Sequence, residues 1–223
     1  MFDRITPIVK QLLIANVAIF ILSQLAQQFF YSNFAFFNPI LPNSEQLMNP
    51  NFKAWQVLTY MFMHGSMGHL FSNMFGLFIF GSTLETYMGS KKFLIYYIIT
   101  GIGAAVLNSA LNTFEMSQIL ADSEPYWRQA MTPMVGASGA IFGILVAFGV
   151  LFPNVELMLL FFPVPIKAKY FVILYGLYEL YAGTAGLQQG VAHFAHIGGL
   201  ITGLILLKFF GFDERQGQNF RRW

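Results

Sequence analysis

The sequence contains no cysteine among its 223 residues. Disulfide bonds, thiolate metal sites and cysteine nucleophiles are therefore excluded. Charged residues are also scarce: they make up 10% of the chain, whereas a soluble domain typically carries roughly a quarter. Because 56% of the residues are hydrophobic, much of the surface must face something other than water. A net charge of +2 gives no indication of a nucleic-acid partner.

Long stretches without charge predict an all-α polytopic membrane protein with six transmembrane helices. A membrane-spanning helix needs about 20 mostly apolar residues. The first predicted span has a basic start, as a signal peptide does, but its apolar stretch is long and no small-x-small cleavage site follows, which favours an uncleaved helix. The predicted spans lie at about 11–30, 54–84, 93–114 and 129–155, with two more in 170–207 divided near 183–190.

The placement of lysine and arginine predicts the orientation, because cytoplasmic loops hold most of these residues. Only Lys53 and Arg128 fall on the side opposite to the termini. Both termini are therefore predicted to be cytoplasmic, with segments 1–10 and 211–223 flanking a membrane domain at 11–210. The ten basic residues on the predicted cytoplasmic side are Arg4, Lys10, Lys91, Lys92, Lys167, Lys169, Lys208, Arg215, Arg221 and Arg222.

Polar residues from three predicted spans gather near one depth, toward the outer ends of the second, fourth and sixth. Ser138 lies in the fourth span and His196 in the sixth. A histidine can take the proton of a serine hydroxyl and later protonate the leaving amine. His69 and Asn73 are four residues apart on one face of the second span, and they can donate to an oxyanion. The backbone N–H of Ser138 is a further candidate donor.

Glycines spaced by four residues predict close contact between the spans that carry the serine and the histidine. Such pairs let helix backbones approach closely in lipid, which a short serine side chain needs in order to reach another helix. Phe142 follows Ser138 by four residues and is expected to lie against the His196 ring and orient it. The predicted packing glycines are Gly136, Gly139, Gly143, Gly199 and Gly203.

Each polar residue also has a plain structural interpretation. Asn73 alone could form a helix–helix hydrogen bond of about 0.6 kcal/mol. His193 is the main alternative base and is expected nearer the interface, while His64 is expected at the outer mouth, bonded to loop backbone. Glu179 is the one acid inside a span; it could orient a histidine, but a structural pairing with tyrosine or backbone is the preferred expectation. The spacing of His64 and His69 is unsuitable for two metal ligands on one helix face.

Four motifs are notable: 64–73 (HGSMGHLFSN), 85–90 (ETYMGS), 136–139 (GASG) and 195–199 (AHIGG). Together they resemble the rhomboid intramembrane proteases, over about residues 10–210. The resemblance implies Ser138 as nucleophile, His196 as base without a third acid, and His69 with Asn73 around the oxyanion. It also implies a lateral, membrane-embedded first connection and a gating role for the fifth span. Many bacterial members carry tyrosine at the position of Phe142, and Trp55 is followed here by glutamine where a Trp-Arg pair is usual.

The resulting prediction is a serine endopeptidase that cuts transmembrane or membrane-proximal segments of other membrane proteins through an acyl-enzyme. Its expected partners are those substrates and the lipid bilayer, with no cofactor, metal or nucleic acid. The expected location is the bacterial cytoplasmic membrane, with the active site opening to the extracytoplasmic side. A non-catalytic rhomboid-like chaperone or binding protein is the alternative. The Ser–His pair distinguishes the two, because such a protein need not keep it and both residues are present here. A transporter ranks last, because it would favour more buried charges.

Overall fold

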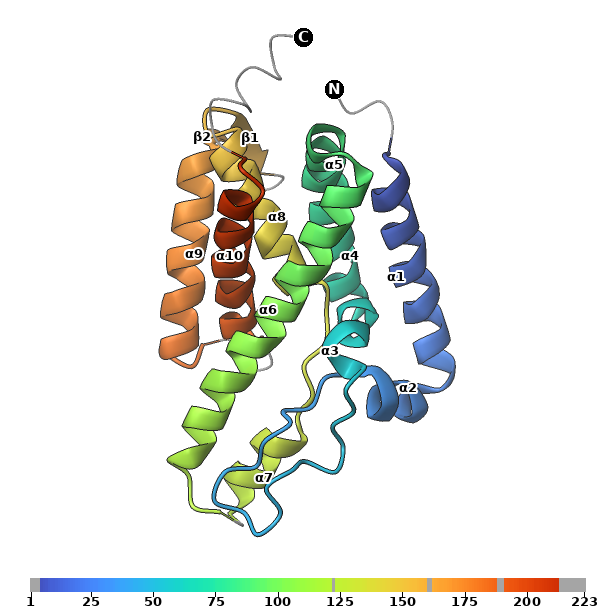
Figure 1. Cartoon of the computed structure of the whole chain (residues 1–223), viewed down its shortest axis with the longest axis vertical. Helices are drawn as coiled ribbons and strands as arrows, with labels where there is room; N and C mark the ends of the chain where they lie inside the picture. Colours follow the sequence, from blue (N-terminus) through green and yellow to red (C-terminus); the bar gives the residue numbers. More distant parts are fainter. Residues whose placement is uncertain (1–4, 122, 160–161, 188–190, 213–223) are drawn as a thin grey trace.

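Helices that run alternately in opposite directions make up most of the chain (Figure 1). The computed structural model describes residues 5–121, 123–159, 162–187 and 191–212. The helices are α1 (Pro7–Leu25), α2 (Gln27–Phe34), α3 (Gln56–Thr59), the 3₁₀ turn η1 (Tyr60–Phe62), α4 (Met67–Gly76), the π-helical turn η2 (Leu77–Gly81), α5 (Ser82–Met88), α6 (Ser90–Ser117), α7 (Glu124–Met131), α8 (Ser138–Leu151), α9 (Ala168–Thr184) and α10 (His193–Phe209). The strands β1 (Glu156–Leu159) and β2 (Phe162–Lys167) form one antiparallel hairpin.

The predicted helical character of the chain is confirmed. Among the described residues, α1 and α6 are long and apolar enough to cross a membrane by length and composition, and α8 and α10 are shorter apolar helices. The expected division of the last apolar region is also present, because α9 ends at Thr184 and α10 begins at His193. The count of six spans and the orientation remain predictions.

Two predicted spans differ from the helices found there. The first, at about 11–30, is not one helix, because α1 runs from Pro7 to Leu25 and α2 begins at Gln27. The fourth predicted span does not begin near residue 129: α7 ends at Met131 and α8 starts only at Ser138. Between them, Gly136 has a φ of +122°, which is incompatible with a right-handed helix. Gly136 therefore lies in the connection and is not a helix-packing residue on α8.

The second predicted span is not one continuous helix. The chain leaves helical geometry after η1 and restarts at α4, where the Ser66 hydroxyl caps the new helix by accepting the His69 N–H at 3.1 Å. His64 lies in this break rather than on a helix. The π-helical turn η2 then separates α4 from α5.

Two other features were not predicted. One is α7; the other is the β1–β2 hairpin, in which Glu156 lies opposite Lys167. The hairpin is at the same end of the molecule as the start of α1 and the end of α10 (Figure 1). Of the predicted C-terminal tail, 213–223 lies outside the described residues, as does the beginning of the predicted N-terminal segment.

The first connection is fastened to the segment that precedes α8. Phe36 and Met134 exchange two backbone hydrogen bonds, at 3.0 and 2.8 Å. The short helix α2 lies across the lower end of α1 rather than continuing it (Figure 1). Whether this connection is embedded in lipid stays a prediction.

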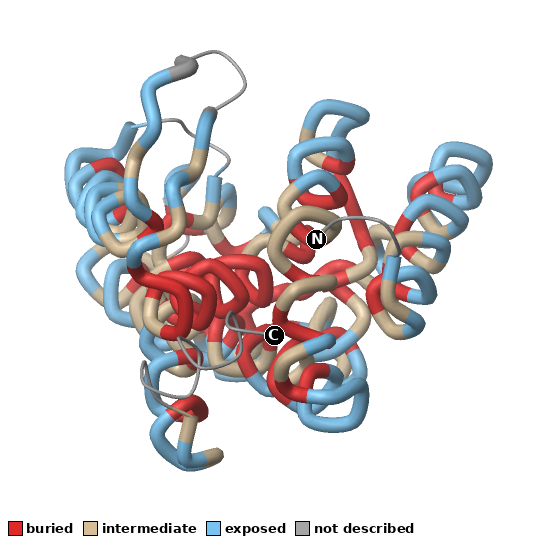
Figure 2. Tube along the Cα trace, turned by 90° about the horizontal axis from the view of Figure 1, so that it is seen from above, coloured by how far each residue is buried: buried red, intermediate tan, exposed pale blue. Residues whose placement is uncertain are grey.

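The core is centred on α6, α8 and α10, which pack together more extensively than any other helices. Figure 2 shows the buried residues gathered toward the middle of the bundle. Glycines permit the contact: a Cβ on Gly199 would overlap the carbonyl group of Gly139, and one on Gly203 would lie 3.1 Å from the Cα of Gly143. These four glycines therefore lie at the helix–helix contact that the sequence predicts, and they place the start of α8 against the start of α10.

Candidate active site

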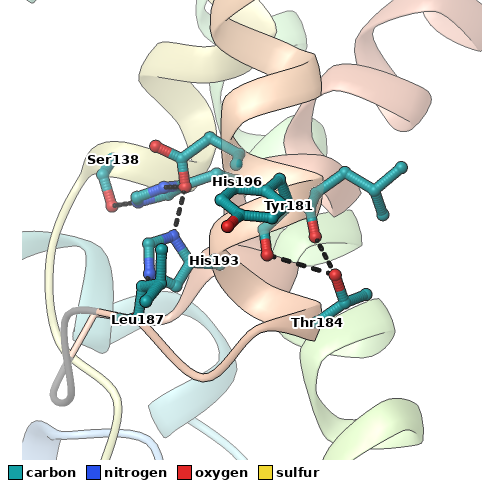
Figure 3. Close-up of polar contacts among 8 residues, drawn as sticks. Ser138, Tyr181, Thr184, Leu187, His193 and His196 are labelled. Atoms are coloured by element: carbon teal, nitrogen blue, oxygen red, sulfur yellow. Dashed lines mark hydrogen bonds and ion pairs between the residues drawn. The ribbon is translucent and has the colours of Figure 1, made fainter.

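Ser138 and His196 face each other across the contact between α8 and α10. The Ser138 hydroxyl lies 2.8 Å from Nε2 of His196, a normal hydrogen-bond length (Figure 3). His196 is buried, whereas Ser138 is half-buried and lines a cavity of about 1510 Å³. The structure thus brings together two side chains that are 58 residues apart in the sequence.

The His196 ring is held by an aromatic neighbour. Phe142 stacks on it with ring centroids 4.2 Å apart and an angle of 8° between the planes. Phe142 also packs against Tyr175 of α9, with ring centroids 4.8 Å apart. Because Ser138 and Phe142 are one turn apart on α8, the same helix face supplies both the hydroxyl and the ring that limits the motion of the imidazole.

His69 and Asn73 line the same cavity as Ser138 and His196. The His69 ring lies against the loop before Ser138, where a Cβ at position 136 would be 2.6 Å from its Cε1 atom. The Asn73 amide donates one N–H to the carbonyl oxygen of His69 at 2.9 Å, and a primary amide has a second N–H to offer. Both side chains therefore share this cavity with the hydroxyl; their role around an oxyanion remains a proposal.

The start of α8 adds backbone donors to the site. Ser138 is the first residue of this helix, and the N–H groups of a first turn have no partner within the helix. The N-terminus of a helix also favours negative charge, because its peptide dipoles are aligned. A developing oxyanion near Ser138 would meet both contributions.

Glu179 has a different environment from the one expected. Its Oε2 atom lies 2.7 Å from Nδ1 of His196 and 2.6 Å from Nδ1 of His193, and its side chain is buried. The expectation of a tyrosine or backbone partner is therefore wrong. The alternative contact, in which this acid meets a histidine, is the one that the structure shows.

The two remaining histidines are both buried. Nε2 of His193 lies 3.0 Å from the carbonyl oxygen of Leu187 and its Nδ1 faces Glu179, so neither ring nitrogen faces Ser138 (Figure 3). The depth of His193 relative to the membrane interface stays a prediction. His64 was expected at the outer mouth of the site, but it is completely buried, with its ring centroid 5.1 Å from that of His69. The polar interior is thus more extensive than the sequence suggests.

Comparison with known proteins gives the family. The family model described as the rhomboid domain matches residues 51–211, which include Ser138, His196, His69 and Asn73. The chain belongs to the rhomboid family. The rhomboid family consists of integral membrane proteins, which agrees with the low charge of this chain.

Several relatives resemble this rhomboid over about two thirds of its length. Rhomboid protease AarA of Providencia stuartii is 36% identical over 159 residues, which are 68% of this chain and 54% of that protein. RHOMBOID-like protein 6, mitochondrial, of Arabidopsis thaliana is 32% identical over 69% of this chain and 43% of that protein. Rhomboid protein 1, mitochondrial, of Saccharomyces cerevisiae is 30% identical over 65% and 38%. The chain therefore spans about half, or less than half, of the length of these curated relatives.

Sequence reasoning ranked a contact between Glu179 and a histidine below a structural pairing and did not predict the contact with both histidines, although a signal was present. An ionisable residue inside a predicted span points to function by default, and here one acid occurs in a span next to a His-x-x-His pair. His193 and His196 are three residues apart, so both lie on one face of α10. The register of α9 against α10, which decides whether Glu179 meets that face, is not readable from the sequence.

The same three residues are also of metal-ligand types. One ligand atom from each of Glu179, His193 and His196 lies within 4.8 Å of the others. Their contacts of 2.6 and 2.7 Å are hydrogen-bond distances. A Zn²⁺ ion at about 2 Å from each ligand would hold those atoms further apart. In this arrangement, protons rather than a cation join the three groups.

Proposed function

We propose that this rhomboid is an intramembrane serine endopeptidase that cuts transmembrane or membrane-proximal segments of other membrane proteins. The observation that carries the proposal is the 2.8 Å contact between the Ser138 hydroxyl and Nε2 of His196, in a cavity that His69 and Asn73 also line. That set supplies a nucleophile, a base and donors for an oxyanion within one site.

The reaction proceeds through an acyl-enzyme. The Ser138 oxygen attacks the carbonyl carbon of the scissile peptide bond while His196 Nε2 takes the hydroxyl proton. The carbonyl oxygen becomes an oxyanion, for which the backbone N–H of Ser138 and the side chains of Asn73 and His69 are the candidate donors. His196 then protonates the leaving amine, and the C–N bond breaks. Water, activated by His196, hydrolyses the ester and regenerates Ser138.

The proposed setting is a bilayer crossed six times, with both termini cytoplasmic and the site opening to the extracytoplasmic side. The bias of basic residues supports this orientation. The common end shared by the start of α1, the β1–β2 hairpin and the end of α10 also supports it (Figure 1). The proposed location is a bacterial cytoplasmic membrane.

The proposed substrate is a helix that must open before it is cut. A helical segment hides its carbonyl groups in hydrogen bonds, so local unwinding has to precede attack. Glycine and proline disfavour helix by about 1 and 3 kcal/mol. We therefore expect cleavage near small or helix-breaking residues.

Two substitutions test the proposal. Ser138→Ala and His196→Ala should each abolish cleavage of a reporter membrane substrate by the purified protein in proteoliposomes, measured by gel and mass spectrometry. Ser32→Ala, which alters an exposed hydroxyl, is the matched control and should cleave normally. A fluorophosphonate should label the wild type but not Ser138→Ala. Full activity in either active-site variant contradicts the proposal; binding of the substrate without any cleavage by the wild type would favour a non-catalytic chaperone.

A third substitution tests the oxyanion donors. Asn73→Ala should lower the cleavage rate by roughly 10²-fold, the usual effect of losing one such donor. Fluorophosphonate labelling should slow as well, because the phosphonyl oxygen occupies the same place. An unchanged rate would remove Asn73 from the mechanism.

A further inference from the structure

Glu179 joins two histidines through a single oxygen atom. Its Oε2 is 2.6 Å from Nδ1 of His193 and 2.7 Å from Nδ1 of His196, and all three side chains are buried. We propose that Glu179 and His193 are positioning residues for His196, holding its ring in the protonation form that activates Ser138. This inference rests on the proposed protease function and adds an acid and a second histidine to the same site.

The contact with Ser138 decides which nitrogen of His196 carries the proton. To accept the hydroxyl proton, Nε2 must be unprotonated, and a neutral imidazole then carries its proton on Nδ1. That N–H points to Oε2 of Glu179, which accepts it. When His196 takes the serine proton, the nearby carboxylate stabilises the new imidazolium, as the acid does in a Ser–His–acid triad. Glu179 thus favours both the resting tautomer and the charged form.

His193 is held in a different protonation form by its own two partners. Its Nε2 is 3.0 Å from the carbonyl oxygen of Leu187, and because a carbonyl only accepts, this nitrogen must donate. Its Nδ1 faces the same Oε2 that already accepts from His196. In the proposed arrangement Nδ1 of His193 carries a proton as well, so that His193 is an imidazolium ion paired with the Glu179 carboxylate. A buried carboxylate needs such a partner, because an isolated buried charge is strongly unfavourable.

The ion pair also fixes Glu179 in space. Leu187 belongs to the connection between α9 and α10, so His193 ties the carboxylate of α9 both to α10 and to that connection (Figure 3). The buried residues of α9 are Ala168, Glu179 and Ala182, so Glu179 is the buried polar side chain through which this helix contacts α10. His193 therefore helps to keep Oε2 within hydrogen-bonding reach of His196.

The chain of contacts connects two cavities. Ser138 and His196 line the large cavity, while His193 lines a second cavity of about 240 Å³ that adjoins it and shares lining residues with it. The second cavity has a polar lining, contributed by Asn108, Asn112, Glu115 and Gln129.

A purely structural role is the competing explanation. In that case the three residues would only hold α9 to α10, and any side chain that keeps the hydrogen bonds would serve. The two explanations differ for Glu179→Gln, because the glutamine oxygen can still accept both N–H groups but carries no charge. The electrostatic role fails in that variant, and the structural role survives.

The experiment compares the pH dependence of cleavage in two variants of the full chain, in proteoliposomes. In Glu179→Gln, kcat should fall by about 10²-fold, the order of effect expected for an impaired general base, with KM little changed. The acidic limb of the pH–rate profile should move to lower pH, because the imidazolium of His196 loses its carboxylate. Glu124→Gln, at an exposed acid on α7, is the matched control and should behave as wild type.

His193→Gln should shift the same limb in the opposite direction. Without the neighbouring cation, the carboxylate of Glu179 holds the proton on His196 more strongly, so the acidic limb moves to higher pH. We expect a loss in kcat of about tenfold or less, since the acid remains. The other titratable groups beside the cluster are His69 on α4, Tyr175 on α9 and Glu115 on α6, and all three are the same in both variants.

The outcomes separate this inference from the proposed function. Wild-type kcat and pH profile in Glu179→Gln would overturn the inference, while inactivity of Ser138→Ala would leave the protease assignment standing. The inference would also be overturned if the acidic limb of the pH–rate profile moved in the same direction in Glu179→Gln and His193→Gln. If Glu179→Gln is too unstable to purify, His193→Gln alone tests the inference: a shift of its acidic limb to higher pH supports it, and an unchanged or lowered limb overturns it. A wild type that neither cleaves nor reacts with a fluorophosphonate would defeat the proposed function, and this inference with it.

Discussion

Two helices that supply polar residues to the site, α8 and α9, are held in place in different ways. In α8, which carries Ser138, twelve of the fourteen residues are buried. In α9, which carries Glu179, three of seventeen are buried, and large apolar side chains such as Leu174 and Leu177 are exposed. Packing on all sides positions the serine, whereas a polar contact between α9 and α10 positions the acid.

The difference follows from the solvent that we propose for this rhomboid. In lipid, an apolar side chain gains no hydrophobic free energy by moving from the bilayer to a helix interface. A peripheral helix therefore needs close backbone packing or hydrogen bonds to have a fixed position. The core helices use glycine for this purpose, and α9 combines a close approach of Gly183 to His193 with the hydrogen bonds of Glu179.

A second peripheral helix follows the pattern of α9. Most of α1 is exposed, and its start is held by a buried acid from α5: Glu85 accepts the backbone N–H groups of Ile8 and Val9 at 3.0 and 2.9 Å. The Ser90 hydroxyl donates to the same carboxylate at 2.6 Å. Buried carboxylates thus fasten both outer helices to the core.

The largest effect is expected where two core helices touch. Gly199→Ala should lower the free energy of unfolding by about 3 kcal/mol, because the added methyl group overlaps the carbonyl of Gly139 and forces α8 and α10 apart. Cleavage should be lost with it, since the distance from Ser138 to His196 grows. Gly68→Ala on α4 is the control, as a Cβ there meets nothing within 4 Å. A stable and active Gly199→Ala would break the comparison between core and periphery.

Matched isoleucines on α8 and α9 give the next largest difference. Ile144 is fully buried on α8 and Ile173 is exposed on α9. Ile144→Ala should destabilise by about 2 kcal/mol, the lower end of the usual range, because in lipid only the packing and cavity contribution remains. Ile173→Ala should change stability by less than about 0.5 kcal/mol. Equal losses in detergent unfolding experiments would contradict the view that α9 is held by polar contacts.

Glu85→Gln tests whether a carboxylate fastens α1. Burial alone would raise the pKa of Glu85, but hydrogen bonds from Ser90, Ile8 and Val9 lower it overall from its ordinary value of 4.5. Such a group stabilises the fold above pH 4.5 and loses this contribution as the pH falls through its lowered value. The variant should therefore be less stable by about 1.5 kcal/mol at pH 7. The difference from wild type should shrink in unfolding curves recorded below pH 4.5, and a constant difference would contradict the assignment.

The smallest effect is expected at the ring that stacks on His196. Phe142→Leu removes a contact worth about 1 kcal/mol, which corresponds to about a fivefold loss in kcat/KM. Phe142→Tyr keeps the ring and should stay within about twofold of wild type in the same cleavage assay. Equal losses in the two variants would mean that ring stacking does not orient the histidine.

The sequence was sufficient to predict the general fold and the residues that gather in the site. Apolar stretches predicted helices, and the motifs around Ser138, His196 and Asn73 indicated the family because those residue types rarely coincide in membrane segments. The stacking of Phe142 on His196 followed from helical spacing alone.

Local interruptions and inter-helix register could not be predicted in the same way. A search for long uncharged stretches does not report the break at 63–66 or the delayed start of α8, because neither segment contains a charged residue. The local signals that it passed over are Gly65 in the first segment and Pro133 and Gly136 in the second. Glu179 meets His196 only because α9 has one particular rotation and height against α10, and a single sequence contains no measure of either.

The left-handed backbone at Gly136 has a consequence for redesign of this protein. A side chain there would need both an unfavourable backbone conformation and the space that the His69 ring fills. Positions 69 and 136 are therefore one combinatorial unit, and a mutant library that varies them independently would consist largely of misfolded chains. Variation of substrate choice should instead begin at cavity positions whose neighbours are free to adjust.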